Sequence, residues 1–155
     1  MIVVQHMPAM FTKLLAERLD PISQVKVSEA RDGDRIVPGT VYIAPGDFNI
    51  RVVYGDEITL NQDAPRHGVR PCADILMESV AEVYGLRAVG IVLTGMGNDG
   101  TAGAKAIKDL GGHVVAEHES TCVVYGMPKS VVSAGLADEV VSLPLIADSI
   151  IELSK

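Results

Sequence analysis

The sequence predicts an α/β fold: a doubly wound, largely parallel sheet with helices on both faces and a small antiparallel hairpin. Short apolar runs alternate with amphipathic segments through most of the 155 residues. The run at 89–93 is continuously apolar, as is typical of a strand that is buried on both faces of a parallel sheet. A glycine-rich turn, TGMGNDG, directly follows this run and precedes a helical pattern. We therefore expect one domain organised around that turn.

The first half of the chain contains three expected strands, one helix and the hairpin. The helix has Phe11, Leu14, Leu15 and Leu19 on one face, with Pro8 near its first turn and Asp20-Pro21 at its end. The hairpin turns at Gly55-Asp56, a pair that suits a tight turn between β-branched runs. The expected elements are strand 1–5, helix 9–19, strand 25–28, strand 40–44 and hairpin strands 49–54 and 57–60.

The second half continues the alternation of strands and helices. Proline opens two of its helices, at Pro71 and Pro144, and Gly111 is placed to end a third in a left-handed cap. The expected elements are helix 71–85, strand 89–93, helix 101–110, strand 113–116, helix 126–134, strand 139–143 and a helix from 144 onward.

Composition excludes several classes of protein. Thirteen basic and 20 acidic residues leave a net charge of −7 and a pI near 5.0, which removes the attraction that dominates nonspecific nucleic-acid binding. We also expect no membrane insertion, because no apolar run approaches the roughly 18 residues that a spanning helix needs. Cys72 and Cys122 stand 50 residues apart and predict no disulfide framework. The expected compartment is the cytoplasm.

Candidate functional residues follow the strands, because ligands of open parallel sheets bind at the carboxyl ends of the strands. His6, Asp99 and the segment 117–121 have such positions. A histidine with an aspartate partner is the base and the orienting group of a nucleophilic triad. Ser120 and Thr121 are the hydroxyls on this edge, but neither has the glycine-flanked elbow of a serine nucleophile. A loop-bonded histidine and a purely structural Asn-Asp-Gly turn explain the same pattern.

A second interpretation is a dinucleotide site. Gly95, Gly97 and Gly100 form G-x-G-x-x-G between a strand and a helix, and Glu117 follows 22 residues after Gly95, where a ribose-binding acid belongs. Asp99 argues against this interpretation, because it would place a carboxylate where the backbone must receive a pyrophosphate.

Metal and cofactor sites are not predicted. His67, His113 and His118 have no ligand-like spacing with one another or with a carboxylate pair. Arg70, before the second helix, is interpreted as a solvated or capping residue, with framing of a substrate as the lesser alternative.

Five segments occur in this order along the chain: QHMPAMFTKLLAERLD, VYIAPGD, RPCADILMESVA, GIVLTGMGNDG and STCVVYGMPKSVV. In their order and spacing they resemble the catalytic domain of the bacterial chemotaxis protein-glutamate methylesterase. The resemblance covers nearly the whole chain and implies hydrolysis of γ-glutamyl methyl esters on the cytoplasmic region of chemoreceptors. It also implies deamidation of receptor glutamines, both through a serine, histidine and aspartate triad without a cofactor.

The resemblance assigns roles to three residues. His6 is the general base, Asp99 orients it, and the backbone N–H of Met96 is an oxyanion donor. The nucleophile belongs to a Ser-Thr-Gly-Gly turn on a strand that precedes the QHMP segment, and this chain begins after that point. We therefore expect a methylesterase-like catalytic domain over 1–155 without its first strand and nucleophile turn, and without the family's receiver domain.

Two consequences follow from the missing serine. Alone, the chain should be inactive or a weak catalyst, because loss of a triad member leaves only roughly 10³-fold catalysis over water in well-studied serine enzymes. The exposed sheet edge left by the missing strand predicts self-association. A noncatalytic binding module of the same fold remains the alternative.

Overall fold

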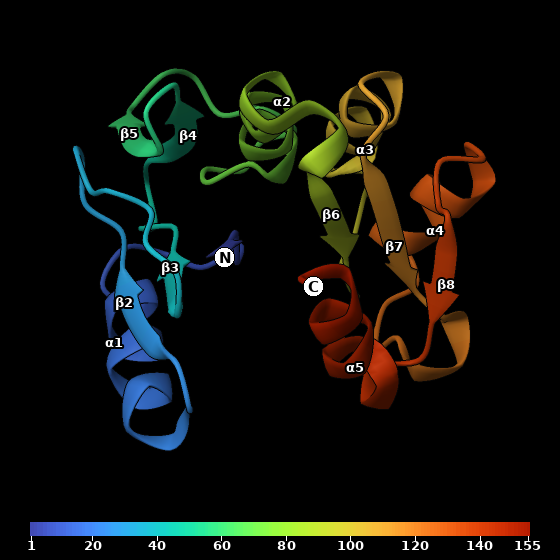
Figure 1. Cartoon of the computed structure of the whole chain (residues 1–155), viewed down its shortest axis with the longest axis horizontal. Coiled ribbons are helices and arrows are strands. Elements are labelled where there is room, and N and C mark those ends of the chain that lie inside the picture. The colour runs from blue at the N-terminus through green and yellow to red at the C-terminus, as the bar shows by residue number, and fades with distance from the viewer. The chain divides into compact units, whose positions relative to one another are not determined.

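The computed structural model describes all 155 residues as two compact units, Met1–Ser79 and Val80–Lys155, and each is described by itself (Figure 1). The longest helix, α2 (Ala73–Tyr84), contains the boundary. None of the helices is long and apolar enough to cross a membrane.

The first unit contains a three-stranded parallel sheet and an antiparallel hairpin. In the sheet β3 is central, and the strand order is β1-β3-β2. Its register pairs Ile2 with Tyr42 and Lys26 with Thr40. The hairpin strands β4 and β5 pair from Asn49 with Asn61 to Val53 with Glu57, which confirms the predicted hairpin. The strands are β1 (Ile2–Val3), β2 (Lys26–Glu29), β3 (Thr40–Ile43), β4 (Asn49–Val53) and β5 (Glu57–Asn61).

Helix α1 (Phe11–Leu19) covers β2 and β3, with Ala16, Val27 and Ile43 in a shared core. It begins two residues later than predicted, because Met10 has a φ of 75° and cannot belong to a right-handed helix. Phe11 and Leu14, predicted to share the apolar face of this helix, are exposed; Thr12 and Ala16 are buried instead. Asp20-Pro21 does not end the helical conformation at once, since a 3₁₀ turn continues over Asp20–Ile22.

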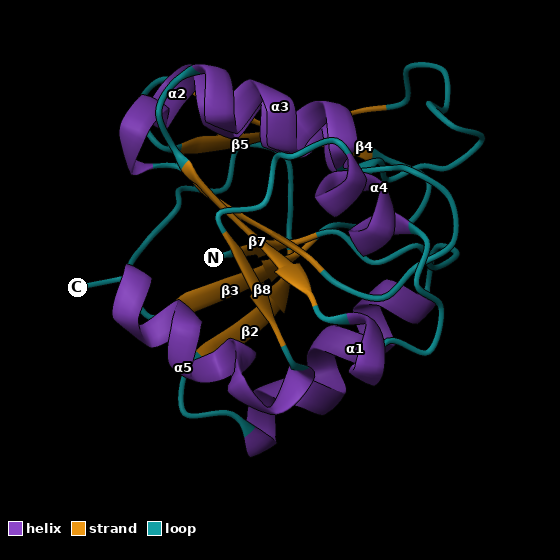
Figure 2. Cartoon of the chain, turned by 90° about the vertical axis from the view of Figure 1, so that its right-hand side faces the viewer, coloured by secondary structure: helices purple, strands orange, loops and turns teal.

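The second unit contains the parallel sheet β6-β7-β8. Helices α3 and α4 pack against β6 and β7, and Figure 2 shows α5 on the opposite side of this sheet. Parallel strands with helices on both sides confirm the predicted fold class. The elements are β6 (Val89–Val92), α3 (Thr101–Asp109), β7 (His113–Glu117), α4 (Met127–Ser133), β8 (Glu139–Val141) and α5 (Leu143–Leu153).

The most buried strand of this unit is β7, not β6. Val114, Val115 and Ala116 are all inaccessible, whereas Val89 of β6 is 37% exposed. The prediction that 89–93 is buried on both faces is therefore wrong in this structure. The reason is position: β7 has a strand on each side, whereas β6 is hydrogen-bonded to β7 alone.

Asp138 joins α3 to the start of β7 and β8. Its carboxylate accepts hydrogen bonds from Lys108 and, at 2.8 Å, from the backbone N–H of Val114. Partial burial alone would raise the pKa of Asp138, but the bonds from Lys108 and Val114 and the charges of Lys108 and His113 together lower it below the ordinary 3.8. The ionised carboxylate therefore stabilises the folded state.

We expect Asp138→Asn to lower the free energy of unfolding by about 1.5 kcal/mol at neutral pH, because a hydrogen bond with a charged group is lost. A carboxyl whose pKa is depressed by folding stabilises above its ordinary pKa and loses that contribution as pH falls. The difference from wild type should therefore shrink below about pH 4 in urea titrations. Asp109→Asn is the control: its exposed pair with Lys105 should contribute little. Equal losses in both variants would contradict the assignment.

Candidate active site

His6 lies in the loop that follows β1, at the carboxyl edge of the first sheet, and its side chain is exposed. His6 follows β1 as predicted, although the strand ends at Val3 and not at residue 5. The loop continues with a tight turn in which Met7 N–H donates to the carbonyl of Gln5 at 2.8 Å. Farther along, Phe11 N–H donates to the carbonyl of Pro8 at 3.2 Å and starts α1.

The His6 loop packs against the turn that follows β3. A Cβ built on Gly46 would lie 2.3 Å from the backbone N of Ala9 and 2.7 Å from the carbonyl O of Met7. Only glycine allows two backbones to approach this closely. The buried hydroxyl of Thr12 accepts from Gly46 N–H at 2.9 Å and donates to Glu29 Oε1 at 2.7 Å. The segments QHMP and IAPGD therefore form one structural piece that positions His6.

Arg70 anchors the next loop to the same turn. Its guanidinium donates to the carbonyls of Gln62 at 2.8 Å and Asp63 at 3.0 Å, and it pairs with the carboxylate of Asp47. The arginine side chain is only 19% exposed. The interpretation of Arg70 as a solvated or helix-capping residue is therefore wrong: it connects the 45–47 turn to the 61–70 loop.

Asp99 lies in the turn between β6 and α3 and is 2% exposed. Its Oδ1 accepts from the backbone N–H of Gly100 at 2.9 Å. Gly97 and Gly100 have φ values of 88° and 91°, in the left-handed region that favours glycine. The Met96 side chain, in contrast, is 82% exposed. The turn thus encloses a carboxylate while it exposes Met96 at the unit's surface.

The segment 122–127 holds this turn in place. Gly95 N–H donates to the carbonyl of Val124 at 3.1 Å, and Met127 N–H donates to the carbonyl of Gly95 at 2.8 Å. A Cβ on Gly126 would lie only 2.6 Å from the Gly95 carbonyl O. The TGMGNDG and CVVYGMP segments therefore depend on each other for their shape.

Glu117 ends β7 inside the protein and supports the same turn. It is inaccessible to solvent, and its Oε2 accepts from Thr94 N–H at 2.8 Å. A ribose would need this carboxylate at the surface. The arrangement argues against the dinucleotide interpretation of Gly95, Gly97 and Gly100.

Ser120 lies on the predicted edge but belongs to a local turn. Nδ1 of His118 accepts from the Ser120 N–H at 3.1 Å and lies 2.8 Å from its Oγ. The Thr121 hydroxyl is likewise used, since it accepts from Leu143 N–H at 3.0 Å. Cys122 follows, and burial first and then the nearby charge of Glu117 raise the pKa of its thiol. These contacts give the segment a structural role.

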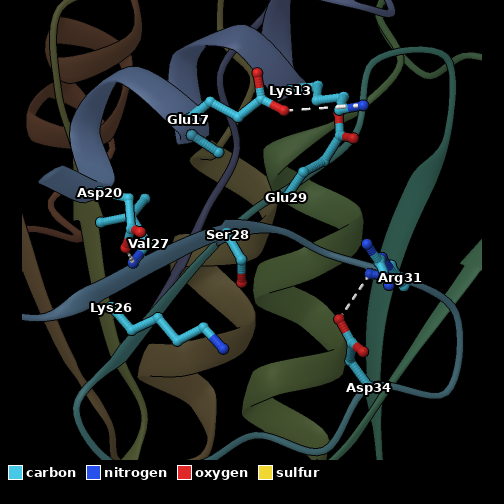
Figure 3. Close-up of a pocket in the computed structure, with 10 residues that line it drawn as sticks. Lys13, Glu17, Asp20, Lys26, Val27, Ser28, Glu29, Arg31 and Asp34 are labelled. Carbon is cyan, nitrogen blue, oxygen red and sulfur yellow. Dashed lines mark hydrogen bonds and ion pairs between the residues drawn. The ribbon is translucent and has the colours of Figure 1, made fainter.

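A separate hollow of about 410 Å³ lies beside α1 and β2 in the first unit (Figure 3). Its polar groups are engaged locally: Asp20 accepts from Val27 N–H, Asp34 accepts from Arg31 N–H, and Lys13 pairs with Glu17. Both signs of charge are mixed around it, so no set of groups converges on one kind of ligand.

His6 belongs to the first unit, and Met96 and Asp99 belong to the second. The sequence pattern located His6 and Asp99 after strands, and the family resemblance added Met96. The structural roles of Thr12 and Gly46 were not predicted. A threonine in an amphipathic helix is expected at the surface, so nothing in the sequence indicated that Thr12 is buried. The APGD segment indicated a turn, but not that Gly46 lies against the backbone of the 7–9 segment.

Comparison with solved structures places the chain in a class of α/β hydrolytic domains. The structure matches the Thermotoga maritima CheB methylesterase catalytic domain with a TM-score of 0.94 and 46% identity, over 98% of this chain and 82% of that one. The CheB methylesterase family model matches residues 1–150. The chain belongs to the CheB methylesterase family.

Similar proteins carry a common name. "Protein-glutamate methylesterase/protein-glutamine glutaminase 1" of Syntrophomonas wolfei is 47% identical over 98% of this chain and 45% of its own length. The protein-glutamate methylesterase/protein-glutamine glutaminase of Symbiobacterium thermophilum is 50% identical over 96% of this chain and 41% of its own length. The chain thus spans less than half the length of these curated relatives.

Proposed function

We propose that this chain is the catalytic part of a protein-glutamate methylesterase that also deamidates glutamine. The family match over residues 1–150 carries the proposal. The setting of the residues supports it: His6 is exposed at a strand end, and Asp99 is buried in a glycine turn. The relatives' names state both activities.

In this mechanism the nucleophile is a serine in a Ser-Thr-Gly-Gly turn outside the 155 residues. His6 takes the serine proton as Oγ bonds to the ester carbonyl carbon, and then gives the proton to the departing methoxide, which leaves as methanol. A water molecule then loses a proton to His6 and attacks the acyl-enzyme carbonyl. His6 gives this proton to the serine oxygen as the acyl–oxygen bond breaks, and the released glutamic acid side chain loses its own proton to water to become the carboxylate.

Asp99 and Met96 have supporting roles in this proposal. A buried carboxylate is suited to hold an imidazole in one tautomer and to stabilise the imidazolium that forms during attack. The Met96 N–H, in a turn that exposes its residue, is suited to donate to the oxyanion. The proposed substrate is the methylated cytoplasmic region of a chemoreceptor, so the proposed compartment is the cytoplasm.

An unpaired sheet edge supports the proposed serine-bearing strand. β1 is hydrogen-bonded to β3 alone, so its other edge is unpaired within its sheet. We infer that the strand before the QHMP segment adds to this edge, and that without it the edge promotes self-association, as unpaired edges do.

The test extends the chain at its N-terminus with the relatives' strand and Ser-Thr-Gly-Gly turn. The extended protein should release methanol from a receptor fragment with γ-methyl glutamate, and a serine-to-alanine change in the extension should abolish release. If the extended protein has a native circular dichroism spectrum but releases no methanol, the chain is better interpreted as a noncatalytic binding module.

A further inference from the structure

Three side chains with different ligand atoms lie together in the first unit. One ring nitrogen of His67, the Sγ of Cys72 and a carboxylate oxygen of Asp74 all lie within 4.8 Å of one another. Cys72 and Asp74 are inaccessible to solvent, whereas the His67 side chain is 31% exposed. None of the three has a part in the reaction proposed above.

The local fold brings these residues together despite their unpromising spacing. His67 and Gly68 have φ values of 55° and 73°, and Val69 N–H donates to the carbonyl of Arg66 at 3.0 Å. This turn reverses the chain, so that His67 lies over the start of α2. Asp74 is in the first turn of that helix and Cys72 directly precedes it. The H-x₄-C-x-D pattern therefore converges on one point.

The close contact between His67 and Asp74 marks where a cation would bind. Nε2 of His67 lies 2.7 Å from Oδ2 of Asp74. The Cys72 sulfur lies within 4.8 Å of a ligand atom of each, so a third ligand stands beside this pair. In tetrahedral zinc sites, bonds of about 2.0–2.3 Å put ligand atoms about 3.3–3.8 Å apart. A small rearrangement, in which His67 and Asp74 separate slightly, reaches this spacing.

The donor set favours zinc. Sulfur, imidazole nitrogen and carboxylate oxygen together suit a borderline-soft divalent ion, whereas magnesium and calcium prefer oxygen ligands alone. A Cys72 thiolate and the Asp74 carboxylate would balance the two positive charges. Arg66 carries a positive charge that opposes cation binding, since its Nη2 lies 3.9 Å from Asp74 Oδ2. Its Nη1, however, is paired with the Glu78 carboxylate at 2.7 Å. Glu78 thus offsets the arginine.

We propose that His67, Cys72 and Asp74 supply three ligands of a binding site for one zinc ion. Three protein ligands suffice to hold zinc at catalytic sites, where the fourth position is left to another ligand. The site would fasten the 66–70 loop to the first turn of α2. Because the 61–70 loop is also tied by Arg70 to the 45–47 turn, metal binding should stabilise the first unit.

Cobalt(II) is the probe for the experiment, because a thiolate-bound cobalt ion gives a near-ultraviolet charge-transfer band that zinc lacks. The full chain, treated with a chelator and dialysed, should bind about one cobalt ion with this band, and zinc should displace it. Cys72→Ser should abolish the band. His67→Asn and Asp74→Asn should weaken cobalt affinity by more than about a hundredfold.

Two matched variants serve as controls. Cys122→Ser removes the other thiol, whose raised pKa disfavours the thiolate, and should leave the band intact. His113→Asn removes a surface histidine that also contacts a carboxylate, Glu139, at 2.9 Å, and should leave the affinity unchanged. Thermal unfolding followed by circular dichroism without metal checks that every variant folds.

Three results would overturn the proposal: no saturable cobalt or zinc binding by the folded chain, a charge-transfer band that survives Cys72→Ser, or a His67→Asn variant that binds cobalt as tightly as wild type. If Cys72→Ser fails to fold, His67→Asn decides, because its side chain is partly exposed and its loss leaves the core intact. Zinc should also raise the Tm of wild type and not that of His67→Asn.

Discussion

His6→Ala, in the protein extended with the serine-bearing strand, is expected to lower kcat for methyl-ester hydrolysis by roughly a millionfold, the scale of losing the general base in a serine hydrolase. Without the imidazole, the serine keeps its proton and methoxide must leave unprotonated. Because His6 is exposed in a loop, the substitution should leave the stability nearly unchanged. Methanol release under single-turnover conditions measures the effect.

His118→Ala is the matched control for His6→Ala. His118 also follows a strand, β7, but its Nδ1 is used in a local turn with Ser120. Its loss should change kcat by less than about tenfold, since it has no role in the proton transfers. Comparable losses for His118→Ala and His6→Ala would remove His6 from the mechanism.

Gly46→Ala is expected to have the largest effect on stability, at about 3 kcal/mol of lost unfolding free energy, because the added methyl overlaps a neighbouring backbone. The new Cβ would lie 2.3 Å from Ala9 N and 2.4 Å from the backbone C of Pro8. Neither group is a flexible side chain, so the 7–9 segment must move, and His6 with it. Urea titration measures the stability, and kcat in the extended protein should fall in parallel.

Gly39→Ala separates steric overlap from backbone strain. Gly39 has a φ of 72°, but no atom lies within 4 Å of the position that an alanine Cβ would take. The substitution therefore adds only the strain of an alanine in the left-handed conformation. That strain costs about 1 kcal/mol. If Gly39→Ala destabilises as much as Gly46→Ala, close packing of the His6 loop is not what Gly46 provides.

The order and type of the elements were predictable because apolar periodicity is a local property of the sequence. The hairpin illustrates this: Gly55-Asp56 between β-branched runs predicts the observed pairing of β4 and β5. Burial was less predictable, because it depends on neighbours in space. Val89 in β6 is exposed and Val114 in β7 is buried, although both lie in apolar runs. The sheet order, not the residue type, separates them.

The candidate site was partly predictable for the same reason. His6 and Asp99 follow apolar runs, and the rule that sites lie at the ends of parallel strands is enough to select them. The contacts that support His6 could not be predicted from the sequence, because Thr12 and Gly46 are 34 residues apart and come into contact only in the folded chain. The His67, Cys72 and Asp74 cluster was also hidden, since its convergence requires the left-handed residues of a turn.

His6 and Asp99 are proposed to act as one catalytic unit. A double-mutant cycle in the extended protein tests it most directly, with kcat for methanol release measured for His6→Ala, Asp99→Asn and the double variant. We expect Asp99→Asn alone to lose roughly 10⁴-fold, and the double variant to be no slower than His6→Ala, since an orienting group has no effect without the base. Losses that multiply in the double variant would contradict the claim.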